Sequence, residues 1–450
     1  MKTKLSRLTK IIYGGGDLGF SLTTTIIGAF FLFFLTDVVL IKPAVAGMAI
    51  LIGKTWDYVN DPIIGHISDR TRSKWGRRRP FLLFGAIPFA LAFIMMWYKP
   101  PFTSNTALTI YYAAAYVVFD SAATFVYMPY FALTPELTED YDERTALTSY
   151  RMFFSILGSL LAFTVPFMIV GTFTPENAVR VLYMAIIFGI ISALPLWLVF
   201  FNTKEQPTLA PKEKPKLIPA LKAAFKNRPF VFGAVIYLLT WICMDIIQAV
   251  LLFFIKYVLE LEGQSDLIMA LIFVTAIFSL PLWEFASRKL GKRYAYAVGV
   301  AFWAIVQMLL ISIGASISFG VVVFLCVLAG IGVGAAHVLP WSILPDAIEW
   351  DEYQTGERHE GVFYSLITLM HKVASSVAIP LTAVMLDVTN YIPNSPQQPE
   401  SALWGIRILM GPVPAVLLTI AIVFAIKYPL NREQFGKIVD ELNIRRVSEK

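Results

Sequence analysis

The chain has 450 residues, of which 57% are hydrophobic and only 15% are charged. Soluble domains carry about 25% charged residues, so a chain with this composition and a mean hydropathy of +0.67 has more apolar surface than such a domain can bury. The composition predicts an integral membrane protein and excludes most enzymes. The net charge of +6 does not indicate nucleic-acid binding, because most basic residues lie in a few loops between apolar runs.

Twelve apolar runs follow one another along the chain, each about long enough to cross a bilayer as a helix. They cover residues 17–41, 43–66, 81–99, 107–133, 148–170, 179–201, 230–259, 266–287, 294–314, 318–345, 361–388 and 403–428. The sequence therefore predicts an all-α membrane protein with twelve transmembrane helices. Its predicted parts are a six-helix half (1–201), a Pro- and Lys-rich cytoplasmic connector (202–229), a second six-helix half (230–428) and a cytoplasmic tail (429–450).

Lys and Arg residues concentrate in alternate loops, which the positive-inside rule assigns to the cytoplasm. The basic segments are the N-terminal tail, 68–80, the connector, 288–293 and the C-terminal tail. Both termini are therefore expected on the cytoplasmic side of a plasma membrane, without a removable signal peptide. Two acidic loops, 135–145 and 346–360, occupy corresponding places in the two halves and hint at an internal repeat. Cys243 and Cys326 lie inside apolar runs, where a small buried side chain is expected.

The segment KTWDYVNDP (54–62) places charged side chains at the centre of the second run. Lys54, Asp57 and Asp61 share one helix face, with Asn60 beside them. A charge at membrane depth costs about 2.5–3.5 kcal/mol, so the pair of acids requires a neutralising partner. Carboxylate and amide oxygens suit Na⁺ or H⁺, and the cluster predicts a cation site with Asp57 and Asp61 as the metal ligands if Na⁺ is the ion. The structural alternative is a Lys54–Asp57 ion pair with Asp61 at a helix end.

The loop GHISDRTRSKWGRRRP (65–80) resembles the signature loop of the major facilitator superfamily. The resemblance implies that Asp69, Arg70 and Arg77 belong to a gating loop that joins helix ends when the cytoplasmic side is closed. The alternative is that the basic residues only anchor the loop on the cytoplasmic side.

Three longer blocks resemble the glycoside–pentoside–hexuronide:cation symporters, the melibiose permease family. They are KTWDYVNDPIIGHISDRTRSKWGRRRP (54–80), YMPYFALTPEL (127–137) and LPDAIEWDEYQTGERHEGVFYS (344–365). The resemblance implies the major facilitator fold and symport by alternating access around a midplane cavity. It also implies that Asp57, Asn60, Asp61 and Thr124 hold the coupling ion, which is Na⁺ or H⁺, and that no other cofactor is needed.

The sugar-binding acids of melibiose permease are not matched in this chain. Ser21 and Tyr127 stand at their two positions. The residues that the resemblance leaves around the substrate are Lys372, Thr368, Arg151, Phe131 and His337, and Trp341 and Tyr127 offer flat ring faces. The remaining bases indicate an anionic or zwitterionic substrate, with a sugar derivative preferred. Lys372 as a partner of the cation-site acids, and His337 as a plain core histidine, are the structural alternatives.

Two other functions compete with sugar symport. LPWSILPD (339–346) and YPLNREQF (428–435) also resemble the lysolipid-carrying branch of the superfamily, which would make the chain a cation-coupled lysophospholipid symporter. A transport-silent membrane sensor is the alternative of another class. The expected partners are a small-molecule substrate, a monovalent cation and the lipid bilayer, with the protein a monomer. The sequence assigns no role to Asp17, Asp120, Asp245, Lys256 and Glu284.

The predicted topology is testable by cysteine labelling in intact cells. Single cysteines at Lys212 and Ser448 should resist an impermeant thiol reagent, whereas a cysteine at Asn394 should react, because only the last lies in an outer loop. Ready labelling at Lys212 or Ser448 would show that the orientation is reversed.

Overall fold

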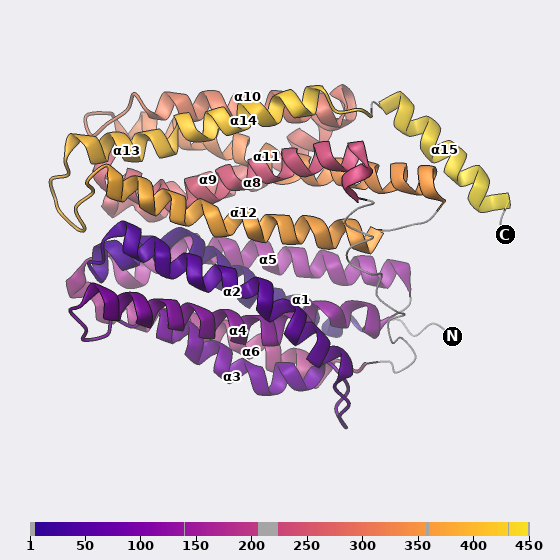
Figure 1. Cartoon of the computed structure of the whole chain (residues 1–450), viewed down its shortest axis with the longest axis horizontal. Helices are drawn as coiled ribbons and strands as arrows, with labels where there is room; N and C mark the ends of the chain where they lie inside the picture. Colours follow the sequence, from indigo (N-terminus) through magenta and orange to yellow (C-terminus); the bar gives the residue numbers. More distant parts are fainter. Residues whose placement is uncertain (1–4, 139, 206–223, 357–359, 431, 449–450) are drawn as a thin grey trace. The chain divides into compact units, whose positions relative to one another are not determined.

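The computed structural model describes residues 5–138, 140–205, 224–356, 360–430 and 432–448, where all regular structure is helical (Figure 1). The chain divides into two compact units. Unit 1 contains residues 1–212, 262–267 and 379–402, and unit 2 contains residues 213–261, 268–378 and 403–450. The first boundary falls inside the predicted connector, of which residues 206–223 lie outside the described part.

Unit 1 is built mainly from the first six long helices. They are α1 (Arg7–Ile26) with the π-helical turns η1 (Ile27–Phe31) and η2 (Phe34–Val38), α2 (Pro43–Arg70), α3 (Arg79–Met96), α4 (Asn105–Leu137), α5 (Tyr141–Val170) and α6 (Ala178–Asn202). Helix α1 begins earlier than the predicted residue 17. Ser6 caps it, because the hydroxyl oxygen of Ser6 accepts a hydrogen bond from the Thr9 N–H.

The remaining helices make up most of unit 2. They are α8 (Arg228–Phe253) with η5 (Phe254–Val258), α9 (Ser265–Leu290), α10 (Lys292–Leu310), α11 (Phe319–Thr355), α12 (Glu360–Val388), α13 (Glu400–Met410), α14 (Pro412–Ile426) and α15 (Arg432–Ser448). The twelfth predicted run is divided at Gly411, because Pro412 starts a new helix. The tail, predicted only as a polar segment, forms the additional helix α15.

Ten helices among the described residues are long and apolar enough to cross a membrane. Helices α1 and α2 are not among these ten. In α2 the reason is chemical, because Lys54, Asp57 and Asp61 lie near its centre and lower its hydropathy.

The backbone repeats itself in the first helix of each half. Each ends in a π-turn that is closed by the same two backbone hydrogen bonds. In unit 1 the Val39 N–H donates to the Phe34 carbonyl and the Ile41 N–H to the Leu35 carbonyl. In unit 2 the Leu259 N–H donates to the Phe254 carbonyl and the Leu261 N–H to the Ile255 carbonyl. Each is followed by a residue with positive φ, Leu40 or Glu260. Corresponding ion pairs occur as well, Arg78–Glu136 in unit 1 and Lys292–Asp346 in unit 2. These features support the internal repeat that the acidic loops suggested.

Helices α2 and α4 approach each other closely in unit 1. A Cβ atom on Gly53 would lie 2.4 Å from the Tyr116 ring, and one on Gly65 would lie 3.0 Å from Met128. In both pairs the residue on α4 is numbered 63 higher, as expected for two helices that run in the same direction. Small residues permit such close packing in membranes, so the two glycines bring the polar residues between them within reach of α4.

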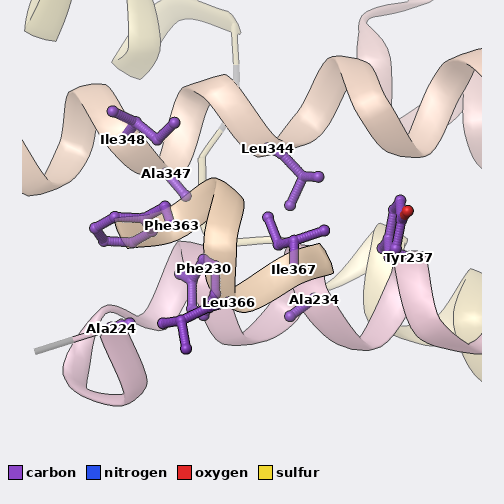
Figure 2. Close-up of a cluster of buried hydrophobic side chains, with 10 residues drawn as sticks. All are labelled: Ala224, Phe230, Ala234, Tyr237, Leu344, Ala347, Ile348, Phe363, Leu366 and Ile367. Carbon is purple, nitrogen blue, oxygen red and sulfur yellow. The ribbon is translucent and has the colours of Figure 1, made fainter. Parts of the chain in front are cut away.

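A hydrophobic cluster joins three helices of unit 2 (Figure 2). Its buried side chains come from Ala224, which precedes α8, and from the start of α8, the C-terminal part of α11 and the start of α12. They include Phe230, Leu344 and Phe363. Tyr237 lies at one end of the cluster (Figure 2), and Trp241 packs against it. The cluster therefore fixes the part of α8 that carries these two aromatic residues.

Candidate functional site

The predicted cation-site residues meet side chains of α4 in unit 1. The buried Asn60 amide donates from Nδ2 to the Asp120 carbonyl oxygen at 3.3 Å and to Asp120 Oδ2 at 3.4 Å. The Thr124 hydroxyl donates to Asp61 Oδ1 at 3.4 Å. Asp61 and Thr124 also differ by 63 in number, and they lie between the two glycine contacts. The structure thus brings Asn60, Asp61 and Thr124 to one interhelical region.

The chemistry of this region suits a hard monovalent cation. Its potential ligands are carboxylate, amide and hydroxyl oxygens, which bind Na⁺ or a proton in preference to soft metals. Among the described residues, no group of three or more His, Cys, Asp or Glu side chains is arranged to hold a metal ion. A metal here would consequently need the neutral oxygens of Asn60 and Thr124. Asp57 is half-buried one turn earlier on the same helix.

Arg151, a predicted substrate contact, forms an ion pair inside unit 1. Its Nε donates to Asp17 Oδ2 at 3.0 Å, and the Asp17 residue is only 3% exposed. The guanidinium also lies over the Phe131 ring, 4.6 Å from its centroid. The pair joins α1 to α5, and it gives Asp17 a role that the sequence did not. Because Asp17 compensates the charge of Arg151, that charge is not a free anchor for an anionic substrate.

Ser21 and Tyr127 stand where the resemblance places sugar-binding acids. The Ser21 and Ser155 hydroxyls form a hydrogen bond between α1 and α5. Tyr127 is 2% exposed, and its ring packs against Phe20 and Phe89 with centroids 5.0 and 5.2 Å away. Its hydroxyl has no hydrogen-bond partner among the described residues. In this structure Tyr127 therefore presents no accessible ring face to a substrate.

The other predicted substrate residues lie in unit 2. Trp341 is 40% exposed, and its ring lies 5.0 Å from the Tyr237 ring. His337, one turn earlier on α11, is exposed and packs against Trp241 at 5.3 Å. On α12, Thr368 is exposed and Lys372 is half-buried. His371 adds a further ring to this group, 4.8 Å from Trp241.

The predicted gating loop forms an ion-pair network within unit 1. Asp69 pairs with Arg78, Arg77 and Arg78 both pair with Glu136, and Arg70 is exposed. The Glu205 carboxylate accepts hydrogen bonds from the backbone N–H groups of Arg77, Arg78 and Arg79 at the start of α3. A carboxylate at a helix N-terminus is stabilised by the helix dipole. Arg78, Glu136 and Glu205 are members of this network that sequence reasoning did not select.

Three further charged residues had no predicted role. Glu284 forms an exposed i,i+4 ion pair with Arg288 on α9. Lys256 lies over the Tyr257 ring at 5.1 Å. Asp245 lies on α8, and its Oδ2 atom is buried without a hydrogen-bond partner among the described residues.

The Asp17–Arg151 pair generates a stability prediction. Asp17→Asn keeps the size of the side chain but leaves the Arg151 charge uncompensated, which should lower the free energy of unfolding by about 3–5 kcal/mol. Thermal unfolding of the purified protein measures the loss, and the double variant Asp17→Asn/Arg151→Gln should recover part of it. As a control, Glu433→Gln breaks an exposed pair with Lys437 and should have an effect of at most about 1 kcal/mol. Unchanged stability of Asp17→Asn would show that the pair is not structural.

Comparison with known proteins identifies the family. A family described as "MFS/sugar transport protein", where MFS denotes the major facilitator superfamily, matches residues 12–432. An uncharacterised symporter of Synechocystis sp. is 33% identical, over 98% of both chains. The sodium-dependent lysophosphatidylcholine symporter 1-A of Danio rerio is 27% identical, over 96% of this chain and 87% of that protein.

Solved structures share the fold at low sequence identity. The crystal structure of a D-xylose–proton symporter matches with a TM-score of 0.68 and 16% identity, over 94% of this chain and 97% of that one. The fold is thus the predicted major facilitator fold, and the chain is a membrane transporter rather than an enzyme. With the family match extending over nearly the whole chain, the protein belongs to the MFS/sugar transport protein family.

Proposed function

We propose that the protein is a Na⁺- or H⁺-coupled symporter of the plasma membrane that carries a substrate with an anionic group. The observation that supports cation coupling is the contact of α2 with α4, where Thr124 donates to Asp61 and Asn60 donates to Asp120. Ionisable residues inside a membrane span are costly and by default mark a path for an ion or substrate, so the concentration of acids at this helix contact supports an ion site.

The proposed coupling follows from charge compensation. Binding of a cation beside Asp57 and Asp61 reduces the net negative charge of the site. Less charge then has to move through the low-dielectric interior when the transporter changes between its two access states. The ion and the substrate together then permit the conformational change, and the ion alone does not complete it. Uncoupled leakage is suppressed for the same reason.

The cation site can be tested by removing its ligands one at a time. Asp57→Asn and Asp61→Asn should each abolish uphill uptake while the protein remains in the membrane, because each removes a carboxylate. Thr124→Ala should be milder, since it removes a neutral oxygen only. Uptake into proteoliposomes under an imposed Na⁺ or proton gradient measures the effect. If either Asn variant concentrates substrate with normal ion dependence, the structural Lys54–Asp57 pair is the correct interpretation.

The first substrate candidate is an anionic sugar derivative such as a hexuronide. The family description supports a sugar, and the absence of acids at Ser21 and Tyr127 argues against a neutral galactoside held by carboxylates. Arg151 is paired with Asp17. Lys372, which the family resemblance places beside the substrate, is the proposed contact for the substrate anion.

The second candidate is a lysophospholipid. Its support is the similarity to the lysophosphatidylcholine symporter of Danio rerio, together with the aromatic group of unit 2. The exposed Trp341 belongs to the LPWSILPD segment, and its ring contacts Tyr237. Tyr127, by contrast, is buried and gives the sugar candidate no stacking surface.

Competition for transport distinguishes the two substrates. Hexuronides, neutral hexosides and lysophosphatidylcholine should be compared as competitors on the wild type and on Lys372→Ala. A charge-assisted contact contributes about 1.5–3 kcal/mol, so the variant should lose about tenfold to a hundredfold in affinity for the charged competitor only. Equal losses for neutral and charged competitors would contradict the role of Lys372. Competition by lysophosphatidylcholine alone would favour the second candidate.

A further inference from the structure

Helix α8 carries a carboxylate that the proposed cation site does not use. Tyr237, Trp241 and Asp245 follow one another at intervals of four residues, so they lie on one side of the helix. The other side of α8 is occupied by packing, because Thr240 bonds to Tyr296 and Cys243 contacts the Pro414 carbonyl. On the Tyr237–Asp245 side, Tyr237 is buried, whereas Trp241 and Asp245 are half-buried and form a separate polar and aromatic group of unit 2.

Aromatic rings from two other helices meet this side of α8. The Trp241 ring lies 5.3 Å from His337 on α11 and 4.8 Å from His371 on α12. The Tyr237 and Trp241 centroids are 5.9 Å apart. The hydrophobic cluster of Figure 2 supports the group from one end, since Tyr237 belongs to it and Trp241 packs against it. The rings are consequently held in place rather than mobile on a surface.

Two polar atoms in this group are buried without partners. Neither Asp245 Oδ2 nor Trp241 Nε1 has a hydrogen-bond partner in the described part of the chain, and both atoms are shielded from solvent. A carboxylate in such surroundings requires a cation or a proton. A metal ion is a poor match, because no group of three or more His, Cys, Asp or Glu side chains among the described residues is arranged to hold one. A carboxylate beside aromatic faces is instead suited to an organic ammonium group.

We propose that Asp245 and Trp241 bind the ammonium group of a zwitterionic substrate. The inference rests on the proposed function, because it adds a positive group to the anionic substrate of the same transporter. Asp245 supplies the opposite charge and the half-buried Trp241 ring supplies a cation–π contact, while the buried Tyr237 ring packs against Trp241 and holds it in place. The Trp241 N–H and the base Lys372, which follows His371 on α12, are the proposed contacts for the anionic part of the substrate. A plain hexuronide lacks the ammonium group, so this subsite favours phosphocholine-like or amino-bearing anions.

Equilibrium binding to the purified full-length protein tests the subsite with two matched pairs of ligands. Glycerophosphocholine is compared with glycerol 3-phosphate, and lysophosphatidylcholine with lysophosphatidate of the same acyl chain. In each pair only the first ligand has an ammonium group. In at least one pair, the wild type should bind the ligand with the ammonium group about tenfold more tightly than the ligand without it.

The variants separate the subsite from general damage. Asp245→Asn should bring the two affinities of the preferred pair within about threefold of each other, and Trp241→Leu should reduce the preference as well. Glu284→Gln removes a carboxylate that is 61% exposed elsewhere in unit 2 and should leave the preference intact. Equal binding within both pairs by the wild type, or an unchanged preference in a folded Asp245→Asn or Trp241→Leu protein, would overturn the proposal.

The subsite and the coupling mechanism fail in different ways. Asp61→Asn should lose the ion dependence of uptake and keep the preference for the ligand with an ammonium group. Asp245→Asn should keep the ion dependence and lose that preference. Ion-independent uptake by the wild type, with the preference intact, would reject the coupling and retain the subsite. Ion-coupled uptake without any ammonium preference would reject the subsite alone.

Discussion

A charge in the hydrocarbon region must be compensated, and this constraint determines the polar interior of the protein. An uncompensated ionised side chain at that depth costs about 2.5–3.5 kcal/mol even on the mildest scale. The structure meets the cost in unit 1 with the Asp17–Arg151 pair, in which each charge neutralises the other. Between α2 and α4 the structure also supplies neutral donors, because the Thr124 hydroxyl of α4 donates to Asp61 of α2 and the Asn60 amide of α2 donates to Asp120 of α4.

Helix periodicity made the grouping of the charged residues of α2 predictable. Lys54, Asp57 and Asp61 share a face whichever helix they contact, so their proximity follows from the sequence alone. The contribution of Asp120 did not follow in the same way. Spacing shows that Asp120 and Thr124 share a face of α4. It does not show which residues of α4 lie beside Asn60, because that register depends on the close contacts of Gly53 and Gly65, which exist only in the folded chain.

Long side chains were the part that sequence could not place. The 68–80 loop has six basic residues, and their spacing along the chain does not decide which of them pairs with Asp69. In the structure Arg78 pairs with both Asp69 and Glu136. Arg151 was recognised as a base, but its partner Asp17 is 134 residues away along the chain. Tyr127 was expected to offer a ring face to the substrate, yet the rings of Phe20 and Phe89 cover it. Such outcomes depend on rotamers and tertiary contacts that no local pattern encodes.

Two kinds of compensation have different consequences for transport. An arginine ion pair such as Arg151–Asp17 is permanent, because the guanidinium keeps its proton at any physiological pH and separating the buried partners is costly. Neutral donors such as Thr124 and Asn60 orient a carboxylate without adding a charge of their own, so at the proposed cation site an ion that arrives and leaves would change the charge. A transporter needs both, since the permanent pairs keep the helices of a unit together while the exchangeable site alters the cost of moving them. The cation site that we propose on α2 is separate from the Arg151 pair between α1 and α5. Ion binding there would therefore control conformation without loosening the packing of unit 1.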